Sequence, residues 1–132
     1  MQTVRDIAMG LQQLHSKGIA HLNLMPRKFP CLTIVENILV SCAGKIKISN
    51  FGRAKLQHQP NDIEKFDIFS LGIIAWELME GQQYLMEGSE PLETMRKEGP
   101  QFSHGLQLFS NECRQMVEAM LDKDPAKRPT AE

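Results

Sequence analysis

The stretch from Ile68 to Met79 constrains the fold more than any other, because it indicates a helix with almost no polar face. Its large apolar side chains are Phe69, Leu71, Ile73, Ile74, Trp76 and Leu78. A helix that is apolar all round is stable only when neighbouring elements cover it. We therefore expect this helix at the centre of a domain, beginning at the capping-box spacing of Asn61 and Glu64 and ending at Gly81.

An amphipathic helix is predicted near the start of the chain, over residues 3–17. The apolar side chains that recur there at helical intervals are Val4, Ile7, Leu11 and Leu14. Thr3 and Asp6 have the spacing of a capping box, and Gly18 supplies the left-handed residue that ends many helices. Residues 19–26 mix polar and apolar side chains and end in a proline, which predicts a loop.

Two further helices are predicted in the second half of the chain. Pro91 and Gly99 bracket a short one, following the preference for proline first and glycine last. Ser110 predicts the N-cap of the other. The core-facing stripe expected on that second helix is Cys113, Met116, Val117, Met120 and Leu121. Thr130 predicts the cap of one more helix, at the point where the sequence ends.

A small β-hairpin is predicted between the first helix and the central one. Residues 37–40 and 45–48 are β-favouring runs, and Ser41 to Gly44 provides the turn between them. Residues 27–35 show no clear period and are expected to be irregular. The predicted fold is therefore mainly helical, with one short hairpin.

Composition excludes several classes of function. The chain has 15 Lys and Arg against 16 Asp and Glu, a net charge of -1, which argues against a nucleic-acid binder or a membrane-surface reader. No apolar run is long enough to span a bilayer. Cys31, Cys42 and Cys113 are widely spaced and form no C-x-x-C pair, so we expect neither disulfides nor a metal site, and an intracellular, cytoplasmic setting.

Four short motifs, in this order along the chain, resemble the C-terminal lobe of protein kinases. They are Leu14-His15-Ser16-Lys17-Gly18-Ile19 with His21, Glu36-Asn37-Ile38-Leu39, Asn50-Phe51-Gly52, and Asp124-Pro125-Ala126-Lys127-Arg128-Pro129-Thr130. The resemblance implies an α+β family fold of which residues 1–132 form a partial domain. This part would be a C-lobe helical bundle with a small hairpin and no N-lobe. The glycine-rich loop and the phosphate-binding lysine of the family have no counterpart in the sequence.

The resemblance also implies that the chemical positions of the family are altered. Asn23 replaces the aspartate that serves as catalytic base, and a carboxamide cannot accept the proton at neutral pH. Asn50 replaces the magnesium-binding aspartate of the Asp-Phe-Gly motif, which leaves Asn37 as the one matching magnesium ligand. We expect Asn37 and Asn50 to be degenerate Mg-ATP positions and no residue to act in catalysis.

The segment that follows Gly52 departs from the family as well. Leu22 replaces the arginine that often pairs with a phosphorylated activation loop, and residues 53–66 contain no Ser, Thr or Tyr. The Ala-Pro-Glu signature is absent. Arg128, whose family partner is the glutamate of that signature, is therefore expected to pair with Asp62 or Glu64 or to stay solvated.

Residues with a packing role in the family are matched better in this sequence than residues with a catalytic or magnesium-binding role. His21 and Phe51 correspond to residues that stack between the lobes, and Asp67 corresponds to the helix aspartate that hydrogen-bonds the catalytic-loop backbone. Residues 27–35 are an insertion relative to the family, which would separate Asn37 from Asn23 unless it loops out. Intact packing with lost chemistry is the pattern of a pseudokinase.

Three hypotheses follow. The first is an inactive pseudokinase C-lobe that binds a protein partner, with no cofactor. The second is the C-lobe of an ATP-dependent Ser/Thr kinase whose N-lobe lies upstream in a longer parent and which uses Mg-ATP. The third is a truncated product that does not fold alone. Taken singly, Asn23 and Asn50 could also be turn formers and His21 a packed core residue.

Overall fold

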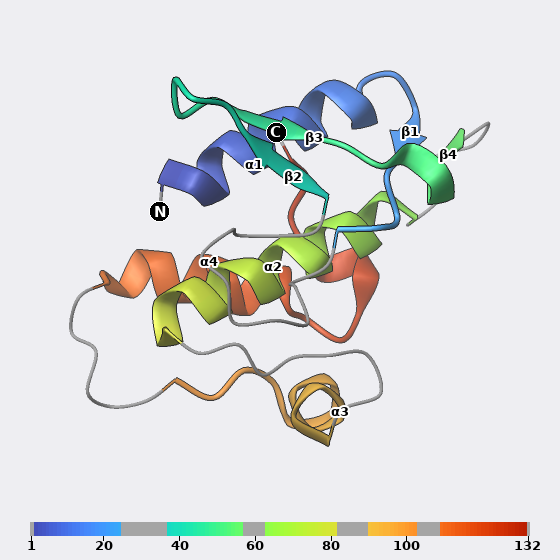
Figure 1. Cartoon of the computed structure of the whole chain (residues 1–132). Helices are drawn as coiled ribbons and strands as arrows, with labels where there is room; N and C mark the ends of the chain where they lie inside the picture. The colour runs from blue at the N-terminus through green and yellow to red at the C-terminus, as the bar shows by residue number, and fades with distance from the viewer. Residues whose placement is uncertain (1, 25–36, 57–62, 82–89, 103–108, 132) are drawn as a thin grey trace.

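The computed structural model describes residues 2–24, 37–56, 63–81, 90–102 and 109–131. At its centre lies helix α2 (Glu64–Glu80), which has α1 and the β2–β3 hairpin on one side and α3 on the other (Figure 1). The α2 side chains that are buried are Asp67, Ile68, Phe69, Leu71, Ile73, Ile74, Ala75 and Met79. The prediction of a buried central helix is therefore confirmed. Trp76 is only partly buried and Leu78 is exposed.

The end of α2 was predicted correctly, and its predicted start at Asn61 lies outside the described residues. The helix begins at Glu64 with Ile63 in the cap position, and no side chain caps it. Glu64 in the first turn instead places a negative charge near the positive end of the helix dipole. Gly81 ends the helix with φ 66°, a conformation that costs glycine little.

Helix α1 (Gln2–His15) packs against α2 through one apolar stripe. Its buried side chains are Val4, Ile7 and Leu11. The capping box predicted at Thr3 does not form, because Thr3 lies inside the helix, which already includes Gln2. Asp6 instead accepts a 2.7 Å hydrogen bond from the Gln2 side chain. Gly18 supplies the expected left-handed turn, with φ 66°.

Helix α4 (Asn111–Met120) packs against α2 on another side. Ser110 caps it as predicted, accepting a hydrogen bond from the Cys113 N–H. The predicted stripe was partly wrong: Val117, Met120 and Leu121 are buried, whereas Met116 is 55% exposed. Cys113 is only partly buried, so the buried stripe is narrower than the spacing suggested.

The remaining C-terminal elements are short. Helix α3 (Glu90–Glu98) begins one residue before Pro91 and ends at Gly99, close to its predicted limits. After α4 the chain forms a 3-10 turn, η2 (Pro125–Lys127), capped by the Asp124 side chain. Residues 129–131 are not helical and residue 132 lies outside the described part. The helix expected after Thr130 therefore stays a prediction.

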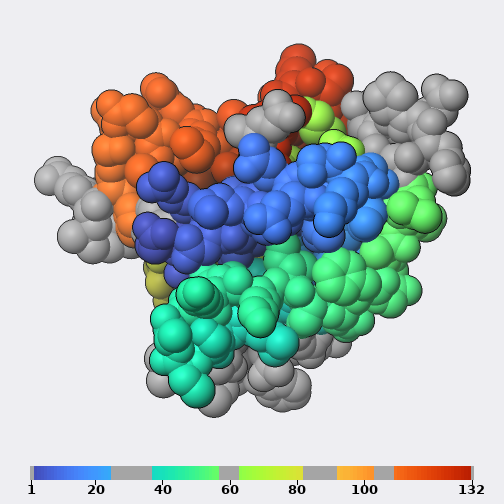
Figure 2. All heavy atoms as spheres, turned by 90° about the horizontal axis from the view of Figure 1, so that it is seen from above, coloured from blue at the N-terminus to red at the C-terminus, as the bar shows by residue number. Residues whose placement is uncertain are grey.

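The hairpin forms as predicted, from β2 (Ile38–Val40) and β3 (Ile46–Ile48), with Leu39 opposite Lys47, and it lies beside α1 (Figure 2). A second antiparallel pair was missed: β1 (Ile19–Ala20) pairs with β4 (Lys55–Leu56), in a region predicted to be loop. Two-residue strands are too short to show a period of two, so only their pairing across the fold reveals them. Next to β4, Phe51–Arg53 forms the 3-10 turn η1. Of the helices described, none has the length and apolar character to cross a membrane.

Candidate active site

Asp67 fixes the backbone of the loop that follows β1. Its side chain is fully buried near the start of α2. One carboxylate oxygen accepts from the His21 N–H and the other from the Leu22 N–H, each at 2.7 Å. His15, at the end of α1, lies with Nε2 3.0 Å from Asp67 Oδ2. A carboxylate only accepts hydrogen bonds, so this histidine nitrogen carries the hydrogen and Asp67 receives three donors.

Leu22 needs this support because its backbone is in the left-handed region, with φ 58°. For a residue other than glycine this conformation costs about 1–2 kcal/mol. The two charge-assisted hydrogen bonds that the consecutive N–H groups of His21 and Leu22 donate to Asp67 offset that cost. The loop therefore takes its shape from α2 rather than from its own sequence.

His21 is fully buried and connects the loop to the hairpin. Its Nε2 lies 2.9 Å from the Ser49 carbonyl oxygen, so this nitrogen donates. Its ring meets the Phe51 ring edge-on, with 5.1 Å between centroids. Its Nδ1 has no hydrogen-bond partner among the described residues. The geometry is that of a packed histidine with one satisfied nitrogen.

Three asparagines that the sequence singled out meet at one place. The Asn37 side-chain amide donates to the backbone carbonyl of Asn23. The Asn50 side-chain amide donates to Asn37 Oδ1 at 2.9 Å. Asn37 is buried, while Asn50 is exposed. Residues 25–36 lie outside the description, and the insertion at 27–35 leaves Asn37 in contact with the Asn23 backbone.

Asn50 is also a turn residue, which was the simpler of the two interpretations that its position allowed. Its φ of 63° and ψ of 69° are left-handed, a region that asparagine tolerates better than most residues. It directly precedes the 3-10 turn that contains Phe51 and Gly52. Phe51 is 48% exposed although it touches His21. The turn role and the contact with Asn37 are therefore compatible.

Arg128 does not behave as predicted. It is buried, and its guanidinium donates to the Asp122 carbonyl at 2.7 Å and the Lys65 carbonyl at 3.0 Å. It also lies over the Phe69 ring, 4.6 Å from the centroid. Burial lowers its pKa from the ordinary value, an effect that the nearby carboxylate of Asp122 opposes.

Glu64, one of the two carboxylates expected to pair with Arg128, is not its partner, and the described hydrogen bonds of the guanidinium go to backbone oxygens. Glu64 faces His15 instead, with 4.0 Å between Oε2 and Nδ1, and Asp62 lies outside the described residues. Lys65 reaches back in turn, with Nζ 2.5 Å from the Arg128 carbonyl. These contacts fasten the segment after α4 to the start of α2.

Sequence reasoning missed three contributors to this region. Ser49 contributes its backbone carbonyl, and Lys65 contributes both its backbone carbonyl and its Nζ, which no spacing in the sequence reveals. His15 could have been suspected, because it is the last residue of a helix whose apolar stripe faces the core. Its distance in sequence from Asp67 hides the contact.

The side chains of the three asparagines and the described groups that they contact are electrically neutral. Their polar atoms are amides and carbonyls, and the nearby Asp67 carboxylate is already shared by three donors. Within the described ranges, no group of three or more His, Cys, Asp or Glu could hold a metal ion. The arrangement can hold a loop in shape, and the described residues around it offer no carboxylate to a proton or a cation beyond the already occupied Asp67.

Comparison with known proteins identifies the class. Residues 56–132 match the protein kinase domain family. Over 97% of its length the chain is 30% identical to a Wee1-like protein kinase of Arabidopsis thaliana, and it covers 27% of that protein. It is 30% identical to the serine/threonine-protein kinase pakA of Talaromyces marneffei, covering 22% of it. It is also 24% identical to a human dual serine/threonine and tyrosine protein kinase, covering 15% of it.

The chain therefore belongs to the protein kinase family. The helical fold with its small hairpin is that of a kinase C-lobe. The chain spans about a quarter or less of the length of these curated relatives.

Proposed function

We propose that this chain is a pseudokinase C-lobe that transfers no phosphate, takes no Mg-ATP cofactor and acts by binding a protein partner. The observation that carries the proposal is the hydrogen bond from the Asn50 amide to Asn37 Oδ1. It joins the two degenerate Mg-ATP positions to each other.

The position of the catalytic base supports the absence of phosphotransfer. A general base must take a proton near neutral pH, and the Asn23 carboxamide does not. Loss of such a base lowers a rate by roughly 10²–10⁴. The backbone carbonyl of Asn23 is also engaged by Asn37. This position then holds the loop in shape rather than receiving a substrate proton.

The cation position supports the absence of Mg-ATP. Mg²⁺ is a hard cation that is bound in phosphate-transfer sites through carboxylates and phosphate oxygens. Asn50 supplies an N–H donor where the family has a carboxylate, and that N–H occupies a lone pair of Asn37 Oδ1. A cation would have to break this contact without gaining a negative ligand. The residues present do not fit a magnesium ion.

The packing around the site supports a binding role. Asp67 and His21 keep the loop and the hairpin together although the chemical groups are neutral. Such a scaffold presents a fixed surface, which is what a regulatory module requires. We place the protein in the cytoplasm, where the free thiols of Cys42 and Cys113 would stay reduced.

Thermal shift with Mg-ATP, on the full chain and on Asn50→Asp, tests this proposal. The unmodified chain is expected to show no shift with Mg²⁺, ATP or both. In Asn50→Asp the new carboxylate faces Asn37 Oδ1 across the former 2.9 Å contact. The hydrogen bond that the Asn50 amide donated is then replaced by repulsion between two oxygens. A cation placed between the two oxygens would relieve it. This variant is expected to melt lower than the unmodified chain and to recover part of the loss with Mg²⁺.

Asn111→Asp is the matched control, since it makes the same substitution at an exposed residue at the start of α4. It should respond to Mg²⁺ no more than the unmodified chain. A clear shift of the unmodified chain with Mg-ATP, abolished by Asn37→Ala, would refute the proposal. The result would support instead a working kinase C-lobe within a longer parent, in line with the names of the relatives.

A further inference from the structure

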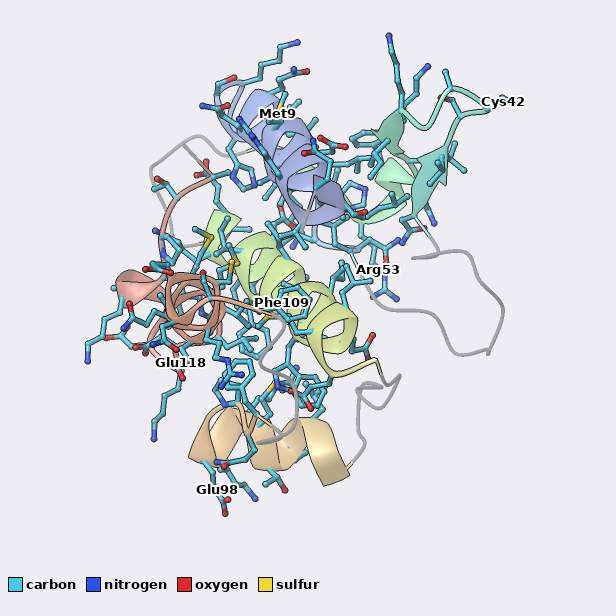
Figure 3. The ribbon with its side chains drawn as sticks, turned by 90° about the vertical axis from the view of Figure 1, so that its left-hand side faces the viewer. Met9, Cys42, Arg53, Glu98, Phe109 and Glu118 are labelled. Atoms are coloured by element: carbon cyan, nitrogen blue, oxygen red, sulfur yellow. The ribbon has the colours of Figure 1, made fainter. Side chains whose placement is uncertain are left out.

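We draw no further inference here: the strongest candidate, the groove of about 410 Å³ between the C-terminal end of α3 and the end of α4, with Glu98 and Glu118 on its rim (Figure 3), carries both acidic and basic side chains around a buried apolar floor, and nothing in the structure shows what covers it.

Discussion

Leu22 and Asn50 are the two non-glycine residues with positive φ in the described chain, and the contacts that hold them differ in kind. Asn50 adopts its conformation by intrinsic tolerance. Leu22 lacks that tolerance, and its N–H group is held by the buried Asp67 carboxylate. The Asp67 carboxylate thus holds the backbone of the loop at Leu22, whereas Asn50 adopts its left-handed backbone conformation without such support.

Asp67→Asn is expected to destabilise the protein by about 3 kcal/mol, because it removes one of two acceptor oxygens and turns an N–H donor toward another donor. Urea unfolding followed by circular dichroism measures the change. Asp6→Asn is the matched control on α1, where the carboxylate accepts from a single surface side chain. It should change the free energy of unfolding by less than about 0.5 kcal/mol. Equal effects of the two substitutions would mean that Asp67 does not hold the loop.

At the scale of elements, glycine decides how closely the helices and the hairpin approach. A Cβ at Gly72 on α2 would lie 2.9 Å from Met120 Cβ and 3.0 Å from Leu121 Cγ. These atoms sit close to the α4 backbone and cannot move without it. A Cβ at Gly10 on α1 would meet Ile48 Cδ1 at 2.9 Å, which is the free end of a flexible side chain.

The substitution of alanine at these two glycines is therefore expected to have opposite results. Gly72→Ala should destabilise by about 1–3 kcal/mol through overpacking of α2 against α4. Gly10→Ala should be neutral or stabilising by up to about 1 kcal/mol, because alanine favours the helix and Ile48 can turn aside. Chemical denaturation of both variants measures the difference. A loss at Gly10 as large as that at Gly72 would contradict this account of α2–α4 packing.

At the scale of the molecule, one core joins elements that are distant in sequence. Residues of α1, β2, α2, α3 and α4 belong to a single buried cluster, with α2 at its centre. The contribution of α3 is smaller, since its described side chains that are buried are Leu92 and Met95. Stability is therefore expected to be highest in α2 and lowest among the helices in α3.

Native-state hydrogen exchange tests this ranking. The α2 amides should exchange only through global unfolding, with protection at least about tenfold above that of α3. A thermal melt of the same sample is expected to show one cooperative transition, as small single domains do. Fast exchange along α2 without a cooperative melt would contradict the single core and support the hypothesis that the chain does not fold alone.

The elements with strong local patterns could be predicted, and the contacts between elements could not. The apolar helix around Ile73, the stripe of α1 and the hairpin flanking Gly44 all follow from spacing within a few residues. The β1–β4 pair was missed, because its partners are short and far apart in sequence. For Arg128 the predicted pairing with Glu64 and the predicted solvation were wrong, because the buried guanidinium donates to the backbone carbonyls of Asp122 and Lys65.

The same distinction, between what could be predicted from the sequence and what could not, applies to the candidate site. The residue types at positions 23, 37 and 50 determine by themselves that these three side chains are neutral, because an amide carries no charge in any fold. Only the tertiary structure decided that Asn50 bonds to Asn37 and that the Leu22 N–H donates to Asp67. The physical reason is that charge and helical periodicity belong to neighbouring residues, whereas these contacts depend on how α2 positions segments that are remote in sequence.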